Sequence, residues 1–304
     1  MIIESVPNFS EGRRREVCDA IRLEIESAGV EFLDLEMDAN HHRSVFTFVG
    51  RSAAALEEAS VRSARKAREL IDLTRHSGEH PRMGALDVCP FVPVEGAAMD
   101  ACVALARAVG RRLGEELGIP VFLYGFAASR PERRDLAAIR TKTRQFEQLR
   151  ELIGRDPALA PDFGPTKIHP TAGCTAVGAR EPLIAFNVNL DSKDLALAKG
   201  IAKAVRERDG GLPGIKALGM MMDSIGKAQV SMNVCDFKAT SLGRVYREIE
   251  RRAAEAGVRI HSSEVVGLLP AAALEPAWVR DLKLEASGFD PARQVIENRV
   301  GQKR

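Results

Sequence analysis

The sequence predicts an α+β protein of two similar halves, each with a four-stranded, mainly antiparallel β-sheet on which helices pack. Two observations lead to this expectation. Short runs rich in Val, Ile, Leu and Phe alternate with longer segments in which apolar residues recur every third or fourth position. The order strand, helix, strand, strand, helix, strand occurs once in each half of the 304 residues.

The first half begins with a short apolar run, followed by a segment in which Val17, Ile21 and Ile25 share one helical face. Ser10 is expected to cap this helix, which ends near Gly29. The last strand contains two prolines, which lack amide donors, so it is expected at a sheet edge or in irregular pairing. Strands are expected at residues 2–7, 30–35, 43–50 and 88–94, and a second helix at 53–73.

The second half repeats this order after some additional elements. The additions are a helix at 99–117, a strand at 119–123 and a helix at 131–152 that Ser129 could cap. The second half has expected strands at 183–190, 215–222, 228–236 and 258–266, and expected helices at 194–208 and 242–256. The βαββαβ order is that of the ferredoxin-like fold, in which helices cover one face of a four-stranded antiparallel sheet.

The length fits two domains, because a domain has roughly 150 residues. We place the boundary so that residues 1–180 form an N-terminal subdomain and residues 181–304 a C-terminal subdomain. Ligand sites are common at domain junctions, so an active-site groove is expected between the two.

The composition disfavours several classes of partner. Lysine and arginine total 44 and aspartate and glutamate 42, and this balance is too even for general attraction to nucleic acid or to a membrane surface. The start Met1-Ile2-Ile3-Glu4 lacks the pattern of a signal peptide, and no apolar stretch is long enough to span a membrane. The five cysteines are scattered and form no C-x-x-C pair, so we expect neither disulfides nor a cysteine zinc site, and a cytoplasmic location.

Residues 74–93 combine His, Glu, Arg, Asp, Gly and Pro in a loop between a helix and a strand, a composition typical of functional loops. Within it, His76-Ser77-Gly78-Glu79-His80 matches the H-x-x-E-H pattern of a zinc peptidase class. That site needs both histidines on one helical face, whereas Gly78 weakens a helix and Pro81 keeps His80 out of the helical region. The sequence therefore argues against zinc.

A second interpretation makes one histidine a general acid or base, because imidazole titrates near neutral pH. Pro81 would hold His80 in an extended backbone, and Gly84 would let the chain turn. The alternative, solvated loop residues that make turn hydrogen bonds, stays open from composition alone.

Seven short motifs resemble the glutamate formiminotransferase family, which also forms the formiminotransferase part of formimidoyltransferase-cyclodeaminase. Together they extend over nearly the whole chain, and their order makes the resemblance specific. The motifs are VPNFSEG at 6–12, RSVFTFVG at 43–50, HPRMGALDVCPF at 80–91, YG at 124–125, DFGP at 162–165, VGAR at 177–180 and LIAFNVN at 183–189.

The resemblance implies transfer of the formimidoyl group from N-formimidoyl-L-glutamate to N5 of tetrahydrofolate, a step of histidine degradation, with tetrahydrofolate as co-substrate and no metal. It implies two subdomains with the site between them, and places the catalytic histidine at His80. We also expect a homodimer. The segment that the resemblance assigns to folate binding consists of Gly164, Pro165, Thr166, Lys167, Ile168, His169, Pro170, Thr171, Ala172 and Gly173.

The reaction suits these residue types. One imidazole could take the proton of the attacking amine and return it to the departing glutamate nitrogen. Carboxylates would stabilise the positive amidinium centre, and arginines would bind the substrate carboxylates in bidentate fashion. For each, a solvated surface residue is the alternative. The acidic candidates are Glu36, Asp38 and Asp87, and the basic candidates beside Lys167 are Arg43, Arg82 and Arg180.

Residues 164–173 are too rich in Pro and Gly for a helix or a central strand, so this segment is a wall or lid of the site, or a linker. Two positions depart from the family pattern: Phe126 stands where an acidic residue often follows the Tyr-Gly pair, and Ala172 stands where an aromatic can occur. His41, His42 and His169 are interpreted as loop residues.

Two alternatives to formimidoyl transfer stay open. The donor could be N-formylglutamate, since a formyl and a formimidoyl group differ by one heteroatom. The chain could also be a folate- or amino-acid-binding module without turnover, because a fold does not fix a function. The sequence ends soon after the second unit, so we expect no cyclodeaminase domain and a hand-off of product to a separate cyclodeaminase.

Overall fold

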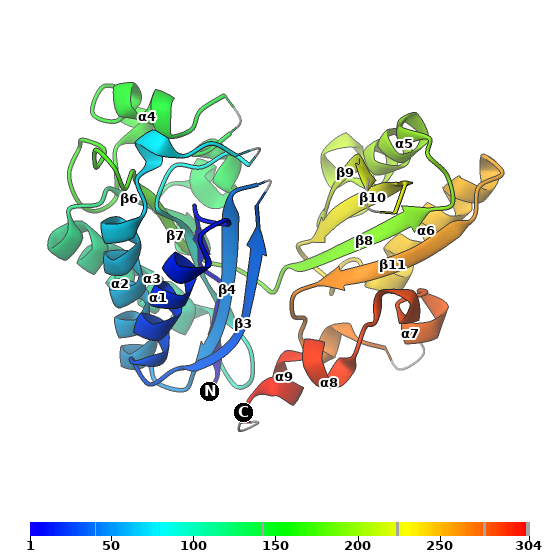
Figure 1. Cartoon of the computed structure of the whole chain (residues 1–304), viewed down its shortest axis with the longest axis horizontal. Coiled ribbons are helices and arrows are strands. Elements are labelled where there is room, and N and C mark those ends of the chain that lie inside the picture. Colours follow the sequence, from blue (N-terminus) through cyan, green and yellow to red (C-terminus); the bar gives the residue numbers. More distant parts are fainter. Residues whose placement is uncertain (40, 79, 142, 223–224, 276–277, 302–304) are drawn as a thin grey trace. The chain divides into compact units, whose positions relative to one another are not determined.

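The structure is a computed structural model, which describes residues 1–304 except 40, 79, 142, 223–224, 276–277 and 302–304. The chain divides into two compact units, Met1–Arg180 and Glu181–Arg304. Each unit has one β-sheet with helices on it (Figure 1). The predicted α+β class is thereby confirmed.

The sheet of the first unit has seven strands in the described part of the chain. Strands β1 and β2 both lie between β4 and β5, and β3 lies on the outer side of β4. Strand β7 follows β5, and β6 forms the other edge. The strands are β1 Ile3–Ser5, β2 Asn8–Phe9, β3 Glu31–Asp38, β4 Arg43–Gly50, β5 Leu86–Pro93, β6 Val121–Gly125 and β7 Thr175–Ala179.

This sheet is a ferredoxin-like core that two further strands extend. With β1 and β2 taken as one interrupted strand, β3, β4, β1/β2 and β5 pair in antiparallel fashion. Strand β7 then adds parallel to β5, and β6 adds parallel to β7. Strand β6 corresponds to the additional strand expected at 119–123, whereas β7 was not expected. Strand β7 was missed because its small residues, Thr-Ala-Val-Gly-Ala, are buried without polar alternation.

Strand β5 is interior, so the expectation of an edge position is wrong and that of irregular pairing is confirmed. Ser5 pairs with Phe91 and Asn8 with Val88, which leaves Pro90 opposite the interruption between β1 and β2. The amide of Val6 still donates to the Pro90 carbonyl at 3.3 Å. The missing amide of Pro90 thus falls where the ladder is already broken.

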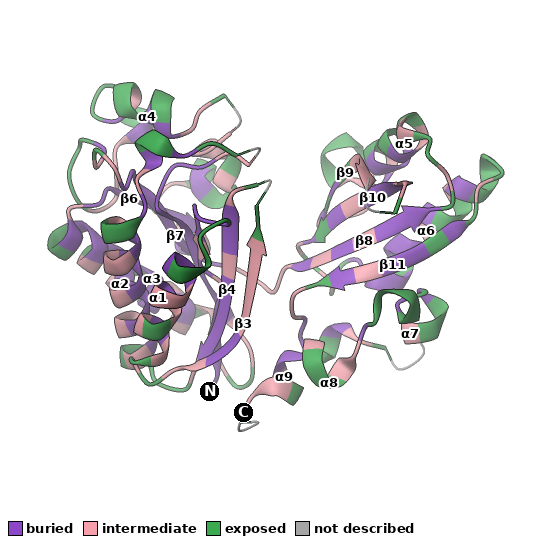
Figure 2. Ribbon diagram, viewed as in Figure 1, coloured by how far each residue is buried: buried purple, intermediate pink, exposed green. Residues whose placement is uncertain are grey.

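Helices α1 (Arg15–Glu26), α2 (Ala53–Leu70) and α3 (Met99–Leu117) lie together on one face of this sheet (Figure 1). Their apolar faces form one buried core with the strands (Figure 2). Ser10 does not cap α1. Its hydroxyl donates to the Gly84 carbonyl at 2.8 Å, which ties the end of β2 to the loop before β5.

The expected helix at 131–152 is wrong for most of its length. The chain forms two 3₁₀ turns, η2 (Pro131–Arg134) and η3 (Leu136–Ala138), and a shorter helix α4 (Phe146–Leu152). The Asp135 carboxylate caps the second turn by accepting from the Ala137 amide, which interrupts a continuous helix. The Ser129 hydroxyl donates to Asp162 instead of capping. Shorter turns elsewhere in the unit are η1 (Leu73–Arg75) and η4 (Pro157–Leu159).

The second unit has a four-stranded antiparallel sheet of ferredoxin-like order, β11-β8-β10-β9. Alternate residues such as Ile184, Phe186 and Val188 are buried, and α5 and α6 contact this sheet. Its strands are β8 Ile184–Leu190, β9 Ile215–Met222, β10 Lys227–Val234 and β11 Ile260–Val266, and its longer helices are α5 Leu195–Val205 and α6 Leu242–Glu255.

Short helices and turns follow in the same unit. They are η5 Glu207–Asp209, η6 Ala271–Ala273, α7 Trp278–Asp281, η7 Glu285–Ser287, α8 Pro291–Gln294 and α9 Ile296–Arg299. Within the described ranges, no helix is both long and apolar enough to cross a membrane.

Candidate functional site

The loop between η1 and β5 holds His80 in a partly buried position. The ring nitrogen Nδ1 lies 2.7 Å from the carbonyl oxygen of Pro81. Because a carbonyl only accepts, Nδ1 bears the proton, and a neutral ring then presents the lone pair of Nε2. Burial, and then the positive charges of Arg43 and Arg140, lower the pKa of His80 to about 3. The imidazole is therefore neutral near pH 7.

Asp87 is fully buried at the start of β5 and organises this loop. Its Oδ1 accepts from the amides of Met83 at 2.7 Å and Gly84 at 3.3 Å. Its Oδ2 accepts from Nη1 of Arg43 at 2.6 Å and from Nη1 of Arg140. Burial alone would raise the pKa of Asp87, but the two guanidinium groups outweigh burial and lower it to about 2.

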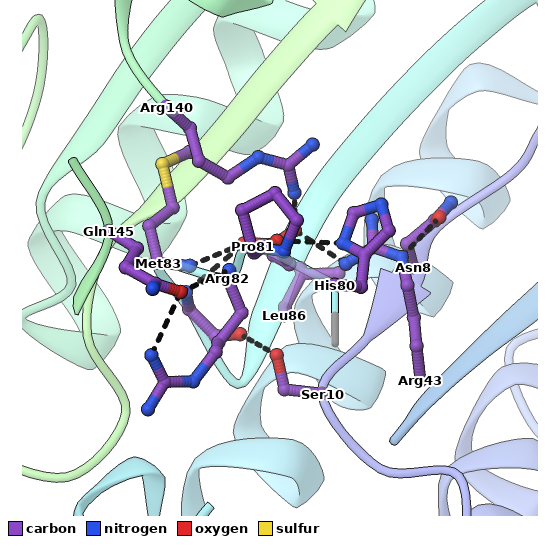
Figure 3. A network of polar contacts seen from close by, with 12 residues as sticks. Asn8, Ser10, Arg43, His80, Pro81, Arg82, Met83, Leu86, Arg140 and Gln145 are labelled. Carbon is purple, nitrogen blue, oxygen red and sulfur yellow. Dashed lines mark hydrogen bonds and ion pairs between the residues drawn. The ribbon is translucent and has the colours of Figure 1, made fainter. Parts of the chain in front are cut away.

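Arg43 and Arg140, which are labelled in Figure 3, come from different parts of the chain. Both donate to the carboxylate of Asp87. Arg43 begins β4, and its Nε donates to Oδ1 of Asn8 at 3.0 Å. The Asn8 amide group in turn donates to the Val6 carbonyl at 2.9 Å. Arg140 comes from the irregular segment after η3. The structure thus brings predicted residues Arg43 and Asp87 together beside His80.

Tyr124 and Arg180 lie beside Arg140. Arg43, Arg140 and Arg180 together are called the basic cluster below. Burial raises the pKa of Tyr124 to about 12, and the charges of Arg180 and Arg140 oppose this rise. The backbone amide of Arg180 donates to the Phe91 carbonyl at 3.1 Å, which fixes the end of β7 against β5. The described surroundings of Asp87 therefore contain more guanidinium than carboxylate charge, an environment suited to an anionic ligand.

Arg82 lies in a second cluster and does not join the first. Its Nε donates to Nδ1 of His76 at 3.1 Å, and its Nη2 donates to the His76 carbonyl at 3.1 Å. Both Nη groups donate to the Glu147 carboxylate, at 2.7 and 2.6 Å, and Nη1 also donates to Gln145 at 3.1 Å. All five N–H groups of Arg82 are used inside the protein, so it braces the loop rather than facing a ligand.

The geometry of His76 disagrees with a zinc site. Its Nε2 donates to the His42 carbonyl at 2.8 Å while its Nδ1 accepts from Arg82, so both ring nitrogens are occupied. Residues 76–78 are not helical, and Glu79 lies outside the described residues. Among the residues that the structure describes, no group of three His, Cys, Asp or Glu side chains is arranged to hold a metal ion.

Of the acidic candidates on β3, Asp38 is linked to His80 through another histidine. The Asp38 carboxylate accepts from the amide of His41 and contacts its Nδ1, each at 2.8 Å. The His41 ring packs edge-on against the His80 ring, with 5.9 Å between centroids. Glu36 is partly exposed two residues earlier, paired with Val45 of β4. His41 lies in the turn before β4, as expected of a loop residue, and its ring contacts that of His80.

The segment at 164–173 divides into two parts. Gly164, Pro165, Thr166 and Lys167 are exposed. The following part folds back on itself through a bridge between His169 and Gly173, with the ring of His169 accepting from the amides of Thr171 and Ala172 at 3.4 and 3.0 Å. Ile168 and Ala172 are buried, and Pro170 is exposed.

The second part of the segment lies against the His80 loop. Gly173 forms a bridge with Gly84, the Ala85 amide donates to the Ala172 carbonyl at 2.8 Å, and the Cys174 amide donates to the Met83 carbonyl at 2.9 Å. The expected folate segment and the expected catalytic loop are therefore neighbours in the structure.

Sequence reasoning missed three residues of this site. Asn8 and Tyr124 lie inside two of the family motifs, at 6–12 and 124–125. The motifs could have identified both residues as site candidates. Arg140 lies in the stretch expected to be helical. Nothing in the sequence there distinguishes a buried arginine from a solvent-exposed one.

Family models cover both units of the structure. Residues 2–180 match the N-terminal subdomain of the formiminotransferase domain, and residues 185–280 match the formiminotransferase domain. The chain belongs to the formiminotransferase family. The first match ends at residue 180, where the first compact unit also ends.

Relatives within the formiminotransferase family are similar along the whole chain. The chain is 46% identical to the glutamate formimidoyltransferase of Streptococcus pyogenes serotype M1 over 300 residues, which covers 98% of each. It is 47% identical to that of Thermoplasma acidophilum over 300 residues, 98% of this chain and 97% of the relative. It is 45% identical over 309 residues to the formimidoyltransferase-cyclodeaminase of Rattus norvegicus, 99% of this chain and 56% of that protein. The predicted family and enzyme class, a transferase, are confirmed.

Proposed function

We propose that this formiminotransferase is a glutamate formimidoyltransferase. It transfers the formimidoyl group of N-formimidoyl-L-glutamate to N5 of tetrahydrofolate, and releases 5-formimidoyltetrahydrofolate and L-glutamate. The observation that carries the proposal is the 46–47% identity, over nearly the full length of both chains, to two glutamate formimidoyltransferases.

His80 is proposed to move the proton in this reaction. N5 of tetrahydrofolate attacks the amidine carbon, and the new C–N bond leaves N5 positively charged. Nε2 of His80 accepts the N5 proton and donates it to the glutamate nitrogen, whose bond to the carbon then breaks. The hydrogen bond from Nδ1 to the Pro81 carbonyl supports this role, because it leaves Nε2 as the acceptor.

The charges around Asp87 support binding of acidic substrates. Both the donor and the folate glutamate tail contain carboxylates. Arg43 and Arg140 supply guanidinium groups near His80, and Arg180 supplies one near Tyr124. Residues 164–173 are proposed to contact the folate, since residues 172–174 pair with residues 83–85 of the His80 loop. Tetrahydrofolate enters as a co-substrate, and the proposed steps use no metal.

Two other activities fit parts of the same site. A formyl donor would need the same proton transfer and carboxylate binding, and a binding module would need only the basic cluster. Every observation that fits these two activities fits formimidoyl transfer equally well.

The test mixes purified protein with N-formimidoyl-L-glutamate and tetrahydrofolate under anaerobic, reducing conditions and measures released glutamate. Release that requires both substrates is expected. A parallel reaction with N-formyl-L-glutamate separates the two donors. Absence of release with either donor, from protein that is folded by circular dichroism, would overturn the proposal.

A further inference from the structure

Arg140 has a buried donor that its surroundings leave unused. Its side chain, labelled in Figure 3, is 10% exposed. Its Nη1 donates to the Asp87 carboxylate. Its Nε is buried and has no hydrogen-bond acceptor among the described residues. A buried N–H without an acceptor destabilises the folded protein, so such a group in a native protein calls for an explanation.

Asp87 has no capacity left for this donor. Its Oδ1 already accepts from the amides of Met83 and Gly84, and its Oδ2 from Arg43 and Arg140. A carboxylate offers about four lone-pair positions, and four donors use them.

Charge leads to the same conclusion. One buried carboxylate faces the guanidinium groups of Arg43 and Arg140, so the trio has a net charge of about +1 at neutral pH. The Nε of Arg43 has Asn8 as its acceptor, whereas the Nε of Arg140 has none in the described part of the chain. An anionic ligand with a free oxygen would satisfy both the charge and the donor.

We propose that Arg140 binds the α-carboxylate of the amino-acid donor beside His80. This inference rests on the proposed function. In N-formimidoyl-L-glutamate one carbon separates the leaving nitrogen from the α-carboxylate, and three carbons separate it from the side-chain carboxylate. The α-carboxylate is thus the group that stays near the reacting atoms and near His80.

The bound carboxylate would also prepare His80 for catalysis. After burial, the charges of Arg43 and Arg140 are the main causes that lower the pKa of His80. A carboxylate that neutralises this charge raises the pKa toward neutral, where a group best accepts and returns a proton. Arg140 therefore links recognition of the donor to the basicity of the imidazole.

The test compares two donors in two proteins. N-formimidoyl-4-aminobutyrate differs from N-formimidoyl-L-glutamate only by the absent α-carboxylate. The parent enzyme is expected to prefer the glutamate donor in kcat/KM by on the order of 100-fold. Arg140→Gln should lose most of that preference by a fall in kcat/KM for the glutamate donor, with no comparable fall for the aminobutyrate donor. The KM for tetrahydrofolate should change little.

Two control variants separate binding from structure. Arg140→Lys keeps the positive charge and should restore part of the preference, while Arg107→Gln, at an exposed position of α3, should leave it at the parent value. An equal loss for both donors in Arg140→Gln, or an unchanged preference, would overturn the inference.

A failure of the proposed function has a different signature. If the parent transfers from neither donor, calorimetry of L-glutamate and 4-aminobutyrate binding still tests Arg140. Selective loss of glutamate binding in folded Arg140→Gln would support the inference, and equal binding by parent and variant would overturn it.

Discussion

Nη1 of Arg43 donates to Oδ2 of Asp87 at 2.6 Å, and joins the start of β4 to the start of β5 across 44 positions of sequence. The same carboxylate accepts from the Met83 and Gly84 amides, which directly follow the His80 turn. One buried charge therefore fixes both the sheet and the loop that positions the imidazole.

Asp87→Asn is expected to destabilise the protein strongly. The amide keeps the shape of the side chain but leaves Arg43 and Arg140 without a buried counter-charge, and breaking a buried pair in this way costs about 3–5 kcal/mol. The free energy of unfolding from urea titrations at pH 7 measures the loss.

The matched control is Asp191→Asn, because Asp191 forms an exposed pair with Lys227 and should contribute little. The double variant Asp87→Asn, Arg140→Gln should lose less than the sum of the single losses, since the two residues are in contact. Additive losses would contradict the coupling described for this pair.

His80→Ala is expected to lower glutamate release by about 10²- to 10⁴-fold, the usual contribution of a general acid–base group. Binding of tetrahydrofolate, measured by calorimetry, should persist because the 164–173 segment is not altered. His261→Ala, at an exposed position of β11, is the control and should keep the parent rate. Equal rates for parent and His80→Ala would remove His80 from the mechanism.

Most of the fold could be predicted from periodicity. In strands such as β9 and β10 and in helices such as α3, apolar residues recur at the spacing expected when one face of the element is buried. The bounds of these elements agree with the expected ones within a few residues. The same reasoning could not find β7, which is buried on both sides between β5 and β6 and therefore lacks alternation.

The stretch at 131–152 shows a different limit. Its composition suits a helix, but Asp135 competes for backbone amides and begins a new turn, a local hydrogen bond that periodicity does not detect. The resulting break places Arg140 at Asp87. The Arg140 contact depends on a long-range fold, so no local pattern could predict it.

For the site residues, the sequence predicted which residue types the reaction needs better than it predicted which side chains contact one another. His80, Arg43 and Asp87 lie together in the structure, whereas Arg82 uses its donors on His76 and Glu147. An arginine in a functional motif can bind a ligand or brace a loop, and only the positions of its acceptors separate the two.

The protein is expected to lose stability in mild acid. Burial lowers the pKa of His76 to about 4 and that of His80 to about 3, from 6.5 in the absence of the fold. Between roughly pH 6.5 and pH 4 the unfolded chain binds more protons than the folded chain, so the free energy of unfolding falls as pH falls. Urea midpoints across this range measure the slope.

His76→Gln should flatten this dependence, because glutamine cannot take up the proton while its amide group can still donate to the His42 carbonyl. His261→Gln, at an exposed position, is the control and should leave the slope unchanged. A slope that is equal in the parent and in His76→Gln would show that this histidine is not protonated on unfolding.

Gly84 and Gly173 are expected to tolerate no side chain, because the two chains that meet there approach too closely. A Cβ at Gly84 would lie 2.1 Å from the Cys174 carbonyl oxygen, and one at Gly173 would lie 2.0 Å from that of Met83. Gly173 also has φ +73°, which disfavours any residue with a Cβ. Each alanine variant should lose more than about 2 kcal/mol of stability, as measured in urea.

Gly200 is the matched control, because it lies within α5 and a Cβ there meets no atom within 4 Å. Gly200→Ala should raise the free energy of unfolding by about 1 kcal/mol, since alanine favours a helix more than glycine does. In folded Gly84→Ala or Gly173→Ala protein, tetrahydrofolate affinity should also fall, because the substitution separates the 172–174 segment from the His80 loop. Unchanged folate affinity in both variants would mean that this pairing supports the fold and not the binding of folate.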